Sequence, residues 1–293
     1  MTIMSNDIKE VIVTEDDFGH EMRVGRVLRG YLGSQTLQGG TYVDPITAKT
    51  RQFDFRWRYQ SGEFGLSLAI ECKNISPDSP VIISGRQRTE SEAFHELVES
   101  RKGGHFRTNR GNVFVDVPAA RVIRRITRNA SVYFPQAFVG KSLLQLKKKD
   151  GKYMRTRDTE IYEKWSQALA SAVDLVDAAG RNATTAANQH IFTFVIPVVV
   201  LPDDTLWKVE YDIKGKIIQD PQLSNEIEFF VGHKAFPPID LGDSSEPYVF
   251  SHLHFVTFTG FAALLLKMTS DEQWSRCAFN DQVIAAAKAE RVE

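Results

Sequence analysis

The chain has 293 residues, with 36 Lys and Arg against 37 Asp and Glu, so its formal net charge is −1. This length fits one elaborated domain or two small ones, with ample residues for a core. The strongest apolar run covers 11 residues, from 191 to 201, and is too short to cross a membrane. The acidic and polar start predicts no secretory signal, and two cysteines offer neither a zinc framework nor an evident disulfide. We therefore expect a cytoplasmic protein with no membrane partner.

Residues 14–32 have the pattern of an amphipathic helix. Thr14 is the expected cap, and the acidic residues after it suit the first turn of a helix. Val24 and Leu28 then begin an apolar stripe at helical spacing. Glu21 lies on this stripe, where a carboxylate needs a partner. It is either part of a polar site or a surface residue paired with a nearby arginine.

Two strands joined by a short turn follow this helix. Residues 53–59 alternate aromatic and charged side chains, so the aromatic rings share one face of a strand and Asp54 lies on the other. In the next strand, residues 66–73, Glu71 and Lys73 share a face. The pattern predicts a β-hairpin with one buried and one charged face.

The turn of this hairpin sets which residues face each other. Gly62 and Glu63 fit the two central positions of a type II′ turn. Paired positions then sum to 125, which places Asp54 opposite Glu71 with Cβ atoms roughly 5 Å apart. A longer loop through Gly65 would shift the register and carry Glu71 to the aromatic face.

The facing carboxylates and the lysine suggest metal chemistry. Two carboxylates this close repel each other unless a cation lies between them or one is protonated. Mg²⁺ takes oxygen ligands and keeps several waters, so Asp54 and Glu71 plus a substrate phosphate suit it. Lys73 can orient the attacking water or stabilise charge on the phosphate. The alternative is a solvated strand face with cross-strand ion pairs.

An Asp on one strand followed by Glu-x-Lys on the next resembles the PD-(D/E)xK nuclease superfamily, which has the restriction-endonuclease-like fold. The resemblance covers residues 15–100, and Phe53 stands where the family name has Pro. It implies Mg²⁺ or Mn²⁺ as the cofactor. The implied catalytic residues are Asp54, Glu71, Lys73 and Glu21, and the implied metal ligands are Asp54, Glu71, Glu21 and the carbonyl of Cys72.

Positive charge is concentrated in residues 101–157. This segment has 15 Lys and Arg but only two acidic residues, a net charge of +13, whereas the rest of the chain carries −14. Such separation indicates a surface for a polyanion, although a solvated surface or an acidic protein partner is the alternative. Arginines at helical spacing from 121 to 128 predict a basic helix, and residues 147–157 a basic hairpin or tip. The candidate nucleic-acid-binding residues are Arg56, Arg58, Arg107, Arg110, Arg121, Arg124, Arg125, Arg128, Lys147, Lys148 and Lys149.

The remaining segments complete an α/β pattern. Predicted strands cover 41–43, 81–83, 189–201, 206–211, 226–231 and 252–258, and predicted helices cover 90–100, 159–179, 262–268 and the segment from 281. The order helix, three strands, helix, strand is the core order of the family that the chain resembles. His252 and His254 share a strand face that would suit a metal, but no third ligand is evident.

The fold class that follows is α/β: a restriction-endonuclease-like core with a central mixed β-sheet flanked by helices, a basic helical insertion and extra C-terminal strands. We expect one elaborated nuclease domain over residues 1–293. Its core covers 15–100 and 158–212, the basic insertion 101–157 and the C-terminal extension 213–293.

The expected function is a metal-dependent endonuclease that hydrolyses phosphodiester bonds of DNA, in restriction, defence or repair. DNA rather than RNA follows from the habit of the family alone. Cutting both strands of a duplex would need two active sites, which a homodimer would supply, and a partner protein could deliver the substrate. The first alternative is a catalytically inactive nuclease-fold protein that binds nucleic acid. The second is an unrelated protein with a fortuitous hairpin.

Overall fold

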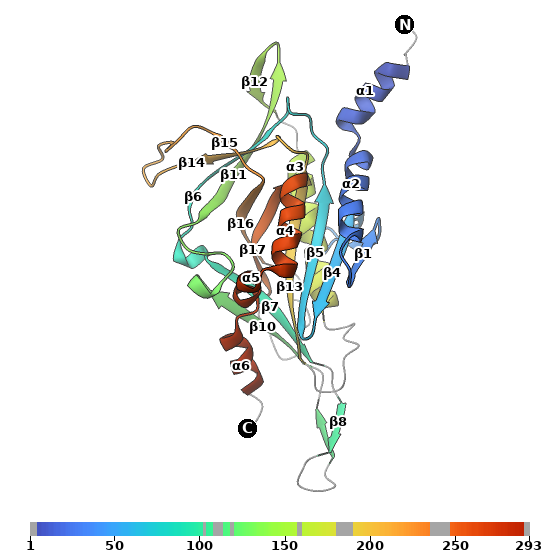
Figure 1. The fold of residues 1–293 in the computed structure, drawn as a ribbon, viewed down its shortest axis with the longest axis vertical. Helices are drawn as coiled ribbons and strands as arrows, with labels where there is room; N and C mark the ends of the chain where they lie inside the picture. The colour runs from blue at the N-terminus through green and yellow to red at the C-terminus, as the bar shows by residue number, and fades with distance from the viewer. Residues whose placement is uncertain are drawn as a thin grey trace.

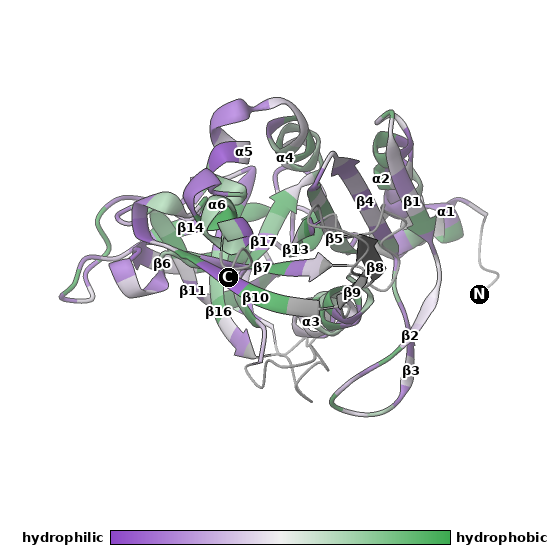
Figure 2. Ribbon diagram, turned by 90° about the horizontal axis from the view of Figure 1, so that it is seen from below, coloured by the Kyte–Doolittle hydropathy of each residue, from purple (hydrophilic) through white to green (hydrophobic). Residues whose placement is uncertain are grey.

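A large mixed β-sheet organises the protein, and helices cover both of its faces (Figures 1 and 2). The computed structural model describes residues 5–101, 104–107, 114–117, 120–156, 160–179, 190–234 and 247–289. The helices are α1 Ser5–Glu15, α2 Asp17–Arg29, α3 Glu160–Ala178, α4 Phe258–Ser270, α5 Glu272–Ala278 and α6 Asp281–Ala289, with 3₁₀ turns at Glu90–Glu92 and Arg128–Ala130. The first strands are β1 Ser34–Gln38, β2 Thr41–Val43, β3 Thr50–Gln52, β4 Phe55–Ser61, β5 Phe64–Cys72, β6 Val81–Gln87, β7 Phe94–Arg101, β8 Gly104–Arg107 and β9 Phe114–Val117. They are followed by β10 Ala120–Thr127, β11 Phe138–Lys149, β12 Lys152–Arg155, β13 His190–Leu201, β14 Leu206–Glu210, β15 Gln222–Leu223, β16 Glu226–Lys234 and β17 Val249–Thr257.

The main sheet has the strand order β1-β4-β5-β13-β17-β16-β11-β6-β14-β15. Strands β1, β4 and β5 form an antiparallel meander, and β13 then lies parallel to β5 after the crossover through α3. The first half of β13 also pairs with β7, and its last residues pair with β17. Strand β13 is therefore bonded along both edges, and burial of both its faces explains its continuous apolar sequence.

Alternation along the central strands divides the core into two halves. Phe55, Leu68 and Val198 face α2 and α4 on one side of the sheet. Ala69 and Val199 face α3 on the other. Figure 2 shows α3 on one side of the sheet and α2, α4 and α5 on the opposite side. The predicted α/β class with a mixed sheet flanked by helices is confirmed.

The N-terminal region differs from the prediction at two points. Asp16, not Thr14, caps α2 by accepting a hydrogen bond from the Phe18 amide, because the chain before it already forms α1. The predicted core strand 41–43 is β2, which pairs only with β3 in a separate ribbon. Strand β1 takes the expected place beside β4.

The predicted helix over 90–100 and the predicted basic helix from 121 to 128 are both wrong. Residues 94–101 and 120–127 form β7 and β10, which pair with each other in antiparallel register. Glu96 and Glu99 of β7 bind arginines of β10, and these cross-strand ion pairs outweigh the helical spacing of the apolar residues. The basic segment, residues 101–157, is also not a separate insertion over its whole length, because its strand β11 lies inside the main sheet between β6 and β16.

The C-terminal strands lie nearer the centre of the sheet than expected. Strand β17 pairs with β13, and β16 bridges β17 to β11. Strand β14 extends the sheet near one edge by pairing parallel to β6. Among the described helices, none has both the length and the apolarity needed to cross a bilayer.

A buried histidine holds β7 to the C-terminal helices. His95 is 1 % exposed, and its Nδ1 and Nε2 lie 2.8 Å from the Ser131 hydroxyl and the Ala278 carbonyl oxygen. A neutral ring satisfies both contacts, because Nε2–H donates to the carbonyl and Nδ1 accepts from the hydroxyl. Burial lowers the pKa of His95 from 6.5 to about 4, although the hydrogen bond to Ala278 opposes this.

Acid should therefore destabilise the fold through His95. Between pH 6.5 and pH 4 the unfolded chain binds this proton and the folded chain does not, so the free energy of unfolding decreases as the pH falls. The expected loss is roughly 3 kcal/mol, since one pKa unit corresponds to about 1.4 kcal/mol. Urea unfolding at pH 7, 5.5 and 4 should show a shallower pH dependence for His95→Gln than for the wild type. Equal slopes would contradict a neutral His95.

Candidate active site

The register of the β4–β5 hairpin is the predicted one. Phe55 pairs with Ile70 and Ser61 with Phe64, so paired positions sum to 125, and Gly62 has a φ of +60°. Asp54 directly precedes β4 and continues this register toward Glu71. Its Oδ2 accepts the Cys72 amide at 2.7 Å. This bond fixes the Asp54 carboxylate at the end of the hairpin where Glu71 lies.

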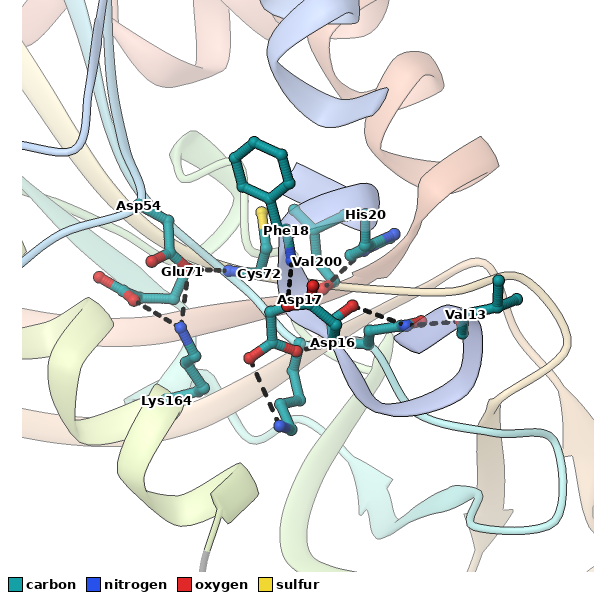
Figure 3. A network of polar contacts seen from close by, with 12 residues as sticks. Val13, Asp16, Asp17, Phe18, His20, Asp54, Glu71, Cys72, Lys164 and Val200 are labelled. Carbon is teal, nitrogen blue, oxygen red and sulfur yellow. Dashed lines mark hydrogen bonds and ion pairs between the residues drawn. The ribbon is translucent and has the colours of Figure 1, made fainter. Parts of the chain in front are cut away.

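A lysine from α3 lies between the two carboxylates (Figure 3). The Nζ of Lys164 is 2.8 Å from Oδ2 of Asp54 and 3.4 Å from Oε2 of Glu71. The Glu71 side chain is fully buried, and those of Asp54 and Lys164 are 15 % and 16 % exposed. Three charges thus meet in a nearly closed space under α3.

The electrostatics show a site with surplus negative charge. Burial, and then the charge of Asp54, raise the pKa of Glu71 well above its ordinary value. Burial alone would lower the pKa of Lys164, but Asp54 and Glu71 raise it, so the lysine is charged at neutral pH. Oε1 of Glu71 is buried with no hydrogen-bond partner among the described residues. An unpartnered carboxylate oxygen in a buried pair fits a cation, so the residues present are compatible with Mg²⁺ or Mn²⁺.

Helix α2 brings two more carboxylates to this region. Asp17 accepts the Asn74 amide at 2.6 Å and lies 3.4 Å from Nζ of Lys73. Glu21 is one turn further along α2, and burial followed by the charge of Asp54 raises its pKa. The charge of Lys164 acts on Glu21 in the opposite direction. Glu21 is therefore within the electrostatic field of the site, and its role as a ligand stays a prediction.

Cys72 is the last residue of β5, and Lys73 follows it directly. The side chain of Lys73 is 13 % exposed and forms an ion pair with Asp17 at the start of α2. The Cys72 thiol is fully buried in the core, and burial raises its pKa well above the ordinary value. Of Cys72, only the carbonyl is suited to a hard cation.

Two of the arginines that were predicted to bind nucleic acid are partly or almost fully buried within the fold. Arg56 is 8 % exposed and contacts Asp174 at 2.7 Å and Ser171 at 3.3 Å, both on α3. Arg58 is about half buried, and burial lowers its pKa. These two residues face α3, where Arg56 is already paired, and their contact with DNA stays a prediction.

Arginines on β10 and directly after it form ion pairs with acidic neighbours. Arg124 lies 2.7 Å from Glu99, Arg125 lies 2.5 Å from Glu96, and the exposed Arg128 lies 3.5 Å from Glu90. Arg110 and the side chains of Arg107 and Arg121 lie outside the described residues. The +13 charge of the sequence is therefore partly neutralised by cross-strand glutamates.

Lys147, Lys148 and Lys149 form the basic hairpin that the sequence predicts. They end β11, which pairs with β12 through a turn at Asp150 and Gly151, both with positive φ. The three lysines are exposed. The hairpin is bonded to the loop between Lys73 and β6, because the Lys148 amide donates to the Asp78 carbonyl oxygen and the Lys148 Nζ lies 3.4 Å from Asp78 Oδ1.

Lys164 is the site residue that the sequence reasoning missed. A signal was present, since Lys164 lies three residues after Ile161 and four before Ala168, both fully or almost fully buried on α3. A charged side chain on the apolar stripe of a helix needs a buried partner, which is the argument that singled out Glu21. Its partners could not be named without the crossover that places α3 over β5.

The two histidines of β17 have acidic neighbours that the sequence did not reveal. Ligand atoms of Glu226, Glu228 and His254 lie within 4.8 Å of one another. However, His254 bonds Glu226 at 3.0 Å and the Tyr133 hydroxyl at 2.9 Å, and Glu228 pairs with the buried Arg88. These groups satisfy one another, so this cluster forms a structural network.

Comparison of the chain with family models, curated proteins and solved structures gave no match.

Proposed function

We propose that the protein is a metal-dependent nuclease that hydrolyses phosphodiester bonds of DNA, as its resemblance to the PD-(D/E)xK superfamily implies. The observation that carries this proposal is the carboxylate of Glu71. It is fully buried beside Asp54, and its Oε1 has no partner in the part of the chain that the structure describes. An unsatisfied buried carboxylate oxygen costs stability unless the site has a use for it. Binding a divalent cation between Asp54 and Glu71 is such a use.

The arrangement of elements around the site supports the same proposal. Helix α2, strands β1, β4 and β5, helix α3 and strand β13 follow the core order that the resemblance implies. The four strands are also neighbours in the sheet, with β5 and β13 parallel across the crossover. The restriction-endonuclease-like core is thus the finer fold that we propose for this α/β protein.

The residues of the proposed site have different chemical roles. A Mg²⁺ or Mn²⁺ held by Asp54 and Glu71 would supply a Lewis acid and an activated water. Lys73, kept near the site by Asp17, stabilises the negative charge that develops on the phosphate in the transition state. Glu21, on α2, would orient water in the site. Helix α3 covers the carboxylates and keeps bulk water away from them.

The basic hairpin supplies a surface for the DNA backbone. In Figure 1 the β11–β12 hairpin projects beyond the end of the sheet toward which β5 runs, and this is the end where Glu71 lies. Its exposed lysines are joined by Lys152 and Arg155, whereas Asp150 lies in the turn and Asp78 pairs with Lys148 at 3.4 Å. Such contacts bind phosphates without sequence preference and weaken steeply with salt.

A nuclease-fold protein that binds nucleic acid without cutting it is the second candidate. The ion pairs of Lys164 favour it, because they already neutralise part of the site without a metal. Asp54, Glu71 and Lys73 are nevertheless all present, and an inactive scaffold has no chemical need for this set.

Cleavage of supercoiled, linear and single-stranded DNA distinguishes the two candidates. With Mg²⁺ or Mn²⁺ we expect the wild type to cut and Lys73→Ala to lose cutting, and EDTA should abolish it. Binding of the same DNA, measured at two salt concentrations, should be similar for both proteins. Salt-sensitive binding without cutting by the wild type would favour the inactive candidate, and neither binding nor cutting would contradict both.

A further inference from the structure

The side chain of Lys164 occupies the space between the two carboxylates of the candidate site. Its Nζ is within ion-pair distance of both Asp54 Oδ2 and Glu71 Oε2. Both carboxylates are held in place independently of it, Asp54 by the Cys72 amide and Glu71 by its position within β5. Lys164 therefore provides the positive charge in a site whose two carboxylates are already in place.

One lysine leaves the negative charge of this site incompletely balanced. Two carboxylates face a single ammonium, and Oε1 of Glu71 has no partner within the described ranges. A divalent cation would balance both charges and could satisfy that oxygen. It would have to approach carboxylate oxygens to about 2.0–2.1 Å. The ammonium lies at hydrogen-bond distance from the same oxygens, so the two cations repel each other and cannot occupy this space together.

The side chain of Lys164 can also move out of the space between the two carboxylates. Lys164 lies in the first turns of α3, and its side chain retains 16 % exposure, so a path to solvent exists. A lysine stem has four carbons and many rotamers, and it can move its charge by several ångströms without moving the helix.

We propose that Lys164 is an internal cation that competes with the divalent metal for Asp54 and Glu71. Without metal, Lys164 keeps the two carboxylates together. When metal enters, the ammonium is displaced toward the open side of the site, where a substrate phosphate would meet it. This inference rests on the proposed metal site, but it does not require that the protein cuts DNA.

Titration of the full-length protein with Mn²⁺ tests the competition directly. Free Mn²⁺ is counted by electron paramagnetic resonance, and heat is followed by calorimetry. We expect one ion per wild-type chain, about 10-fold or more tighter binding by Lys164→Met, and loss of the ion in Glu71→Gln. Lys208→Met is the matched control, because Lys208 is a half-buried lysine paired with a single glutamate, Glu210, away from the site. Its Mn²⁺ affinity should equal that of the wild type.

A second variant keeps the test valid if Lys164→Met does not fold. Lys164→Gln is one atom shorter, keeps a hydrogen-bond donor on the side chain and removes the charge, so it should also bind Mn²⁺ more tightly. Equal or weaker Mn²⁺ binding by folded Lys164 variants would overturn the competition. Absence of cleavage by the wild type, with tighter Mn²⁺ binding by the variants, would contradict the nuclease proposal and leave the competition supported.

Discussion

Replacing Glu71 by Gln is expected to lower the rate of metal-dependent DNA cleavage by at least about 10³-fold, since a bound metal contributes several kcal/mol to charge stabilisation. Gln has the same shape but removes one of the two carboxylates that face Lys164. The measurement is the rate of plasmid nicking at saturating Mg²⁺. The matched control is Glu63→Gln, on the turn of the same hairpin, where Glu63 pairs with Lys288 and should not affect cleavage.

The same substitution should not destabilise the fold. Burial and the charge of Asp54 raise the pKa of Glu71, so folding disfavours its ionised form relative to the unfolded chain. Gln imitates the protonated form, and the melting temperature of Glu71→Gln should be equal to or higher than that of the wild type. Lost activity with retained stability is typical of a residue kept for function. Undiminished, EDTA-sensitive cutting by Glu71→Gln would exclude Glu71 as a ligand.

Replacing Arg88 by Met is expected to destabilise the protein by about 3–5 kcal/mol, the usual cost of leaving a buried charge without its partner. The side chain of Arg88 is fully buried after β6 and pairs with Glu228. It also donates to His252 Nε2 at 3.1 Å and to the Phe134 carbonyl oxygen at 2.8 Å. Burial and the charge of Arg88 lower the pKa of His252 well below its ordinary value, so the histidine accepts this hydrogen bond as a neutral ring.

Urea unfolding at pH 7 measures this effect. The control is Arg276→Met, because Arg276 is an exposed arginine whose ion pair with Glu272 spans one helical turn. Surface pairs of this kind contribute about 0.5 kcal/mol or less. If both variants lost similar stability, the buried network around Arg88 would not be a main support of the fold.

The basic segment illustrates how local spacing can mislead. Arg121, Arg124, Arg125 and Arg128 have helical spacing, but they lie on or beside β10. Spacing along the chain does not encode the acidic partners on β7, and the cross-strand pairs of Arg124 and Arg125 exist only after the two strands align. The same reason explains the wrong helix prediction for β7.

The sequence by itself determined the β4–β5 hairpin, because register in a hairpin depends only on the turn and the two adjoining strands. Gly62 and the alternation of residues 53–59 were sufficient to place Asp54 against Glu71. Long helices and strands such as α3 and β13 were predictable for the same local reason. Only the tertiary structure decided that α3 lies over β5 and brings Lys164 to these carboxylates, 93 residues beyond Glu71 in the chain. That contact depends on a crossover connection and on packing across the sheet, and neither leaves a local pattern in the sequence.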